Sequence, residues 1–310
     1  MLQQANQSIV ADSPFSLDDN AAYLQWCEQR QRYSQPALND LQVSIKDPYQ
    51  LSVDEKAAIV ERCKSFNMAV YQLRDPGIKD KSLVHALGKQ LSMKNLDANI
   101  RADEDSVSSL EVREQAGNKY IPYTNKALSW HTDGYYNPLE KQIFGIIMHC
   151  VRPAAEGGVN SLLNPENVYI RLRDENPAYL EALMHPEAMT IPDNVEAGKV
   201  IREAQSGPVF MIKPPVGSEA GRLHMRFSAR KRNIIWRDTP DTLNAVDMIN
   251  DLLAEEKNVF KVRLEAGQGI ICNNVLHNRA AFSGSDAQKR LLYRARYYGA
   301  VAGAAAMNNE

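Results

Sequence analysis

The spacing of apolar residues predicts that the first third of the chain is rich in helices. Residues 52–66 carry apolar side chains at helical spacing after Ser-Val-Asp-Glu, which has the form of a capping box. An apolar run at 68–73 then predicts a strand, and residues 81–91 return to a helical pattern. A weaker helical pattern covers residues 18–35. Residues 1–100 are therefore expected to supply helices and one or two strands.

The rest of the chain has a different pattern, with many short apolar segments. Residues 142–151 are almost continuously apolar, which is typical of a strand buried on both faces. Asn-Pro at 164–165 and Thr-Pro at 239–240 each predict a helix start, because proline suits the first helical position. Further strands are predicted over residues 208–213, 223–227, 261–264, 269–276 and 291–298. Residues 101–299 thus favour a barrel or sandwich with helical insertions, and the small residues of 300–310 favour a frayed tail.

Composition narrows the class of protein. The chain has 310 residues, 44% of them hydrophobic and 24% charged, which suits one large or two small globular domains. A net charge of −2 gives no global attraction to nucleic acid or to an anionic membrane, so a small molecule is the expected partner. No segment approaches the roughly 20 apolar residues of a membrane span, and a cytoplasmic location is expected.

A possible metal site is the strongest chemical signal. His131 and Asp133 are two residues apart, and on an extended segment such residues point to the same face. His277 follows the apolar segment 269–276 and is the best candidate for a third ligand. Two histidines and one carboxylate with open positions are typical of non-haem Fe(II) oxygenases. An isolated His-x-Asp is also common in surface turns, and the four cysteines are scattered, so sulfur ligands are not expected.

Arginines near the end of the chain add to this signal. Arg290, Arg294 and Arg296 share parity on a strand-like segment, so all three could face one side. Guanidinium groups suit bidentate recognition of carboxylates, which favours an anionic site on that face. A solvated strand edge is the alternative interpretation.

The combination of these landmarks resembles a known family. The pair His131-x-Asp133, a histidine 146 residues later and Arg290 after 13 more are similar to the Fe(II)/2-oxoglutarate-dependent oxygenases of the taurine dioxygenase and clavaminate synthase-like family. The Gly-Gly-containing segment 156–161 lies at a matching distance, and residues 157–163 with 290–298 also look like the glutarate 2-hydroxylase branch. The resemblance implies an α+β fold with a mainly β core. This is a double-stranded β-helix, or jelly roll, with flanking helices, as one oxygenase domain over 1–310.

The resemblance also implies roles for individual residues. His131, Asp133 and His277 match the iron ligands, and Arg290 matches the arginine that binds the far carboxylate of 2-oxoglutarate. Arg294 matches a position that holds the acidic group of the substrate or the cosubstrate. The family has Thr or Ser at a second 2-oxoglutarate contact, where this chain has Asn160 followed by Ser161. The reaction implied consumes 2-oxoglutarate and O₂ and releases succinate and CO₂.

The substrate is predicted only by class. Tyr135 and Tyr136 follow the metal pair, and one of them is expected to line the substrate site while the other packs in the core. Arg226 lies on a predicted strand where family members place substrate-facing groups. The surplus of arginines favours an anionic or zwitterionic small molecule, although tyrosines could also surround a trimethylammonium group. A non-catalytic sensor and a zinc hydrolase with the same three ligands stay open as alternatives, and a homo-oligomer is possible.

Overall fold

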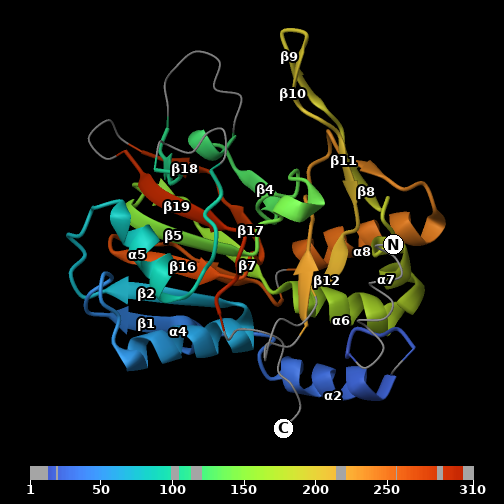
Figure 1. Cartoon of the computed structure of the whole chain (residues 1–310), viewed down its shortest axis with the longest axis horizontal. Coiled ribbons are helices and arrows are strands. Elements are labelled where there is room, and N and C mark those ends of the chain that lie inside the picture. Colours follow the sequence, from blue (N-terminus) through green and yellow to red (C-terminus); the bar gives the residue numbers. More distant parts are fainter. Residues whose placement is uncertain are drawn as a thin grey trace.

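Two β-sheets face each other and enclose the apolar centre on one side of the molecule (Figure 1). The computed structural model describes residues 13–18, 20–98, 105–112, 121–213, 221–255, 257–284 and 289–302. Most of the predicted tail, residues 303–310, lies outside these ranges. The larger sheet consists, in spatial order, of β1 (Gln42–Ile45), β2 (Met68–Leu73), β16 (Gln268–Cys272), β5 (Gly145–Arg152), β19 (Leu291–Tyr297) and β3 (Ser108–Leu110). The smaller sheet consists of β15 (Phe260–Val262), β7 (Asn160–Leu163), β17 (Leu276–Arg279) and β4 (Leu128–His131).

Strand β2 shows why the larger sheet is apolar on both faces. Met68 and Val70 pack between the two sheets, against residues of β5, β7 and β16. Ala69, Tyr71 and Leu73 point the other way and pack under helices α4 (Val53–Phe66) and α5 (Ser82–Gln90). Side chains alternate along a strand, so a strand covered on both sides needs apolar residues at nearly every position.

Helix α4 begins where the sequence predicts. The Ser52 hydroxyl accepts a hydrogen bond from the Glu55 N–H, and the Glu55 carboxylate accepts one from the Ser52 N–H. This reciprocal pair satisfies two N–H groups that the helix itself cannot bond. The helix ends at Asn67, which adopts φ of 59° in the left-handed region.

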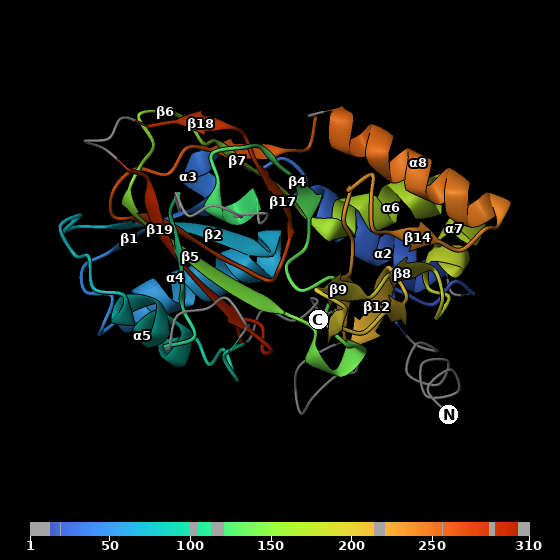
Figure 2. The same ribbon diagram turned by 90° about the horizontal axis from the view of Figure 1, so that it is seen from above.

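The second side of the molecule combines helices and short strands around its own apolar cluster (Figure 1). Its helices are α2 (Asn20–Gln31), α6 (Pro165–Glu175), α7 (Pro177–Leu183) and α8 (Pro240–Ala254). Its strands are β8 (Met189–Ile191), β11 (Gln205–Gly207), β12 (Phe210–Lys213), β13 (Arg222–Met225) and β14 (Ile235–Trp236). Both views show α2 beside α6, although these helices are far apart in sequence (Figure 2). Aromatic contacts of Tyr169 with Phe15, Trp26 and Phe210 join the N-terminal residues to this side.

A hairpin extends from this second side. Strands β9 (Asn194–Glu196) and β10 (Lys199–Arg202) pair only with each other among the described strands and rise above the rest of the molecule in Figure 1. Short elements complete the structure: α3 (Leu38–Leu41), β6 (Glu156–Gly157), β18 (Phe282–Ser283) and the 3-10 turns Ile121–Tyr123 and Leu139–Lys141.

These elements form the predicted α+β fold, a jelly roll with flanking helices. One predicted strand is wrong, because residues 269–276 are divided between β16 in the larger sheet and β17 in the smaller one. The break is a turn at Asn273–Asn274, where Asn274 adopts φ of 52°. His277 therefore lies inside a strand and not in the loop that follows one. No described helix is long and apolar enough to cross a membrane. The cytoplasmic location and the single domain over 1–310 stay predictions.

Candidate active site

The register between two strands of the smaller sheet brings the two site histidines together. His131 on β4 is the antiparallel partner of His277 on β17. Residues paired in this way project to the same face of a sheet, and the two imidazole centroids lie 4.3 Å apart. Both side chains are buried.

Asp133 joins the histidines from a turn and not from a strand. Strand β4 ends at His131, and the chain then turns through Asp133 and Gly134. Gly134 has φ of 70°, and a Cβ there would lie 2.5 Å from Ile143, so only glycine suits this position. Asp133 Oδ1 lies 3.5 Å from His131 Nε2, and the ligand atoms of all three residues lie within 4.8 Å of one another.

Hydrogen bonds prepare these three side chains for a metal ion. The Nδ1 atoms of His131 and His277 each lie 2.9 Å from a backbone carbonyl, of Ser129 and Val275 respectively. A ring that donates through Nδ1 carries its lone pair on Nε2, which is the atom available to a metal. Asp133 Oδ2 is buried without a hydrogen bond from any described residue. This donor set of two imidazole nitrogens and one carboxylate fits Fe(II).

The charge states of the site suit metal binding. Burial alone would raise the pKa of the Asp133 carboxyl, but Arg294, together with the nearby imidazole of His131, holds that pKa well below its usual value. Burial, with the nearby His131, lowers the pKa of His277 to about 4. An ionised carboxylate and a neutral imidazole are the forms that coordinate a metal.

Two of the three predicted arginines have carboxylate partners inside the protein. Arg294 donates a 3.2 Å hydrogen bond to Asp133 Oδ1, and the same nitrogen lies 3.2 Å from Oδ2, within ion-pair distance but without hydrogen-bond geometry. Arg296 forms an ion pair with Asp97 and donates a hydrogen bond of 2.9 Å to the Tyr136 hydroxyl. Their charges are therefore compensated, which corrects the surplus of free positive charge expected from the sequence.

Arg290 differs from the other two arginines. Its side chain is 5% exposed, and its guanidinium lies 5.0 Å from the ring centroid of Phe282. Burial lowers the pKa of Arg290 to about 10. Among the residues that the structure describes, no carboxylate pairs with it. A buried cation without a counterion is expected to attract an anionic ligand.

The strand pairing distinguishes Asn160 from Ser161. In β7, Leu162 is the partner of His277 and Asn160 is the partner of Arg279, so Asn160 lies on the face that carries His277. Ser161 alternates to the opposite face. The Asn160 Nδ2 atom is buried and has no hydrogen-bond acceptor among the described residues, which leaves a donor available on the site's face.

The two tyrosines occupy different environments. Tyr135 is buried in the apolar cluster of the second side, and its ring meets that of His131 edge-on at 6.4 Å. Its hydroxyl accepts a 3.0 Å hydrogen bond from Arg230. Tyr136 is partly buried and is held by Arg296.

The side chain of Arg226 is bonded to the protein backbone. Its guanidinium is fully buried and donates to the backbone carbonyls of Tyr135, Met189, Gly207 and Gln205, at 2.7 to 3.3 Å. These bonds tie the turn after the metal pair to β8 and β11. The expectation of a substrate contact is corrected, because the protein backbone already occupies the donors of this side chain.

Sequence reasoning missed residues that hold the site in place. Thr132 donates its N–H to the Phe227 carbonyl and accepts from the Phe227 N–H, which fixes one side of the metal turn. Asn274 bonds the backbone of Asp133 from the other side. The adjacent asparagines before His277 were the available signal for Asn274, since asparagine often adopts positive φ.

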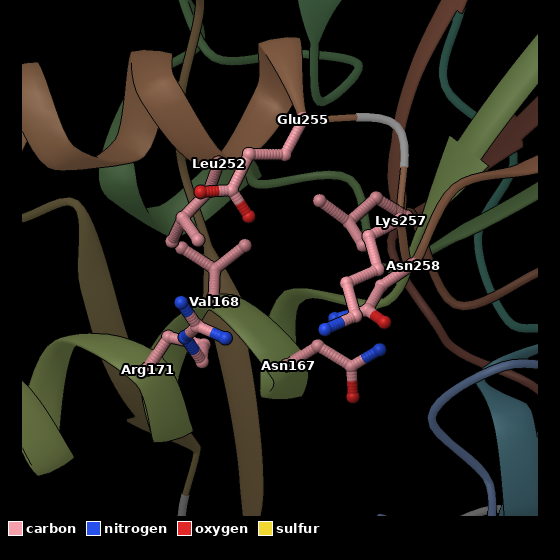
Figure 3. Close-up of a pocket in the computed structure, with 8 residues that line it drawn as sticks. Asn167, Val168, Arg171, Leu252, Glu255, Lys257 and Asn258 are labelled. Carbon is pink, nitrogen blue, oxygen red and sulfur yellow. The ribbon is translucent and has the colours of Figure 1, made fainter.

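A solvent-open hollow elsewhere is separate from this site. Figure 3 shows it between α6 and α8, with Arg171, Glu255 and Lys257 among its lining side chains. None of the residues that line it belongs to the metal cluster or to the arginine set, and we assign it no role.

Comparisons with known proteins agree with the geometry. The family model for the taurine catabolism dioxygenases, TauD and TfdA, matches residues 32–296. A uridine-5'-phosphate dioxygenase from Amycolatopsis sp is 24% identical over 84% of this chain and 97% of its own length. Another from Streptomyces sp is 27% identical over 62% of this chain and 69% of its own length. The structure of the non-heme iron oxygenase OrfP with Fe, succinate and (3S)-hydroxy-L-Arg superimposes with a TM-score of 0.59 at 16% identity, covering 81% of this chain and 82% of OrfP.

Proposed function

The chain belongs to the taurine catabolism dioxygenase family, and we propose that His131, Asp133 and His277 hold its iron while a small anionic molecule is oxidised beside it. As a member of this family it is an Fe(II)- and 2-oxoglutarate-dependent dioxygenase. The observation that carries the residue assignment is the set of three buried ligand atoms within 4.8 Å of one another.

Iron and 2-oxoglutarate, when bound, would supply the oxidising power for the reaction with O₂, with succinate and CO₂ as co-products. The protein positions the reacting groups and excludes water from the site. The carbonyls of Ser129 and Val275 orient the two imidazoles, and Arg294 keeps Asp133 ionised.

Arg290 is proposed to bind the far carboxylate of 2-oxoglutarate. Its burial and its lack of a carboxylate partner among the described residues support this role. Asn160 is proposed as the second contact, in preference to Ser161, because its unpaired Nδ2 donor lies on the face of His277. An amide donor can replace the hydroxyl donor of Thr or Ser in a hydrogen bond to a carboxylate.

The substrate is proposed to carry a phosphate or another strong anion. Two relatives are named as acting on uridine 5'-phosphate, and these matches cover 84% and 62% of the chain. Arg230 is exposed and bonded to Tyr135, whose ring contacts His131, so it presents a cation near the metal cluster.

Anaerobic titration tests the iron and 2-oxoglutarate site. Adding Fe(II) and 2-oxoglutarate to the metal-free protein is expected to give a weak visible charge-transfer band that His131→Ala abolishes. Absence of the band in the wild-type protein would contradict the ligand assignment. The two alternatives give other results, because a zinc hydrolase acts without O₂ and 2-oxoglutarate, and a sensor binds a ligand without turnover.

The substrate class is tested by asking which compounds are converted to product while 2-oxoglutarate is turned over to succinate. Uridine 5'-phosphate, uridine and a neutral amide are compared for succinate release above the substrate-free rate, with product detected by mass. Arg230→Met is expected to raise KM for the phosphate compound by roughly 10-fold or more, whereas Arg232→Met, an exposed neighbour, leaves KM unchanged. Coupled turnover with neutral compounds alone would reject an anionic substrate.

A further inference from the structure

Asn274 connects the segments that carry two of the proposed iron ligands. It lies in the turn between β16 and β17, three residues before His277, and its side chain is 1% exposed. Its Oδ1 atom accepts a 2.8 Å hydrogen bond from the Asp133 N–H. Its Nδ2 atom donates to the Asp133 carbonyl at 2.9 Å and to the Ile143 carbonyl at 2.7 Å.

Asp133 requires such a partner because its backbone has left the sheet. Strand β4 ends at His131, so the smaller sheet does not extend its ladder to Asp133. A buried backbone N–H or C=O that lacks a partner costs free energy, and here one carboxamide satisfies both groups. The side chain of Asn274 therefore takes the place of the next residue of a neighbouring strand.

The backbone of Asn274 adopts a conformation that suits this contact. Its φ of 52° lies in the left-handed region, where asparagine is tolerated better than most residues. The turn directs the carboxamide toward Asp133, while the chain continues directly into β17 and His277. A shift of the turn would change the separation of the Asp133 carboxylate and the His277 imidazole.

We propose that Asn274 is a positioning residue that sets the spacing of the iron ligands by fixing the peptide of Asp133 relative to β17. The proposal rests on the proposed function, since it takes Asp133 and His277 as ligands. It predicts an effect on metal affinity beyond any effect on overall stability, because hydrogen-bonded partners of metal ligands typically contribute roughly 10–100-fold to affinity.

The test compares Asn274→Gly with Asn167→Ala in the 310-residue chain. Both asparagines are buried and donate from the carboxamide to a backbone carbonyl, and glycine accepts the positive φ of Asn274. Asn167 lies on helix α6 and donates its Nδ2 to the Ser34 carbonyl at 3.1 Å, away from the turn at Asn273–Asn274, so it is the matched control. Asn274→Asp, which keeps the acceptor oxygen but loses the NH₂ donor, serves if the glycine variant does not fold.

Three quantities are measured: Tm, the Kd for Fe(II) under anaerobic conditions, and deuterium exchange of the backbone over residues 128–136 in the metal-free protein. Asn274→Gly is expected to weaken Fe(II) binding by roughly 10-fold or more and to speed exchange in this segment. Asn167→Ala is expected to lower Tm while leaving both other quantities at wild-type values.

Two results would overturn the proposal. One is Asn274→Gly with wild-type Fe(II) affinity and exchange. The other is an equal loss of affinity in Asn167→Ala at the same Tm, which would show that general destabilisation explains the effect. Failure of the proposed function is separate, because it appears as absence of the charge-transfer band in the wild-type protein, while exchange in the metal-free protein still reports on the contact.

Discussion

Replacing Arg290 by methionine should stabilise the protein without 2-oxoglutarate and abolish its stabilisation by 2-oxoglutarate. Arg290 is 5% exposed and has no carboxylate partner among the described residues, so none of these residues offsets the desolvation of its charge with an ion pair. Burial lowers the pKa of Arg290 to about 10 from 12.5, a difference that corresponds to about 3 kcal/mol of unfavourable free energy for the charged form. Methionine keeps much of the apolar stem and removes the charge.

The expected gain is therefore about 1–3 kcal/mol in the free energy of unfolding. For a chain of this size that corresponds to a rise in Tm of about 2–6 °C without cosubstrate. Loss of the charged partner should weaken 2-oxoglutarate binding by about 2–5 kcal/mol, which is about 30-fold or more. Thermal unfolding monitored with Mn(II), with and without 2-oxoglutarate, measures both effects.

Arg279→Met is the matched control. Arg279 is 5% exposed, and burial lowers its pKa to about 10 as well, but it donates to backbone carbonyls that include Thr124 at 2.9 Å. Its removal leaves those carbonyls unpaired, so Tm should fall and not rise. A lower Tm in Arg290→Met without cosubstrate, or an unchanged shift with 2-oxoglutarate, would refute the reasoning.

Three other predictions concern buried groups away from the metal. Arg30→Met leaves the buried Glu166 without its ion pair and should lower the free energy of unfolding, measured by chemical denaturation, by about 3–5 kcal/mol. The double variant Arg30→Met/Glu166→Gln should recover much of this free energy. An equal loss in the single and the double variant would argue against a charge effect. Burial lowers the pKa of His149 to about 4, so the unfolded chain binds a proton below its ordinary pKa of 6.5 that the folded chain does not. This contribution to stability is present above pH 6.5 and is lost as the pH falls toward 4; His149→Gln should flatten the denaturation free energy across that range, and an unchanged slope would exclude His149 as the cause. Gly88→Ala places a Cβ against the Tyr297 hydroxyl and should lower Tm through overpacking of about 1–3 kcal/mol, whereas a neutral result would show that Tyr297 can move.

The sequence by itself determined the local elements and the chemistry of the metal cluster. The capping box at Ser52 fixes the start of α4, because both of its hydrogen bonds join residues three apart. The apolar segments around β2 and β5 locate strands, since alternation within a strand and burial on both faces leave a direct pattern in the chain. His131, Asp133 and His277 could be predicted as iron ligands because few side chains bind iron and their order resembles one family.

Only the tertiary structure decided which polar side chains remain available to ligands. Arg226 and Arg296 look alike in sequence, yet one bonds four backbone carbonyls and the other pairs with Asp97, 199 residues away. The pairing of β7 with β17 likewise separated Asn160 from Ser161, and the turn at Asn274 moved His277 into a strand. Hydrophobic periodicity reports on neighbours along the chain, whereas these partners are set by strand register and by contacts between distant segments.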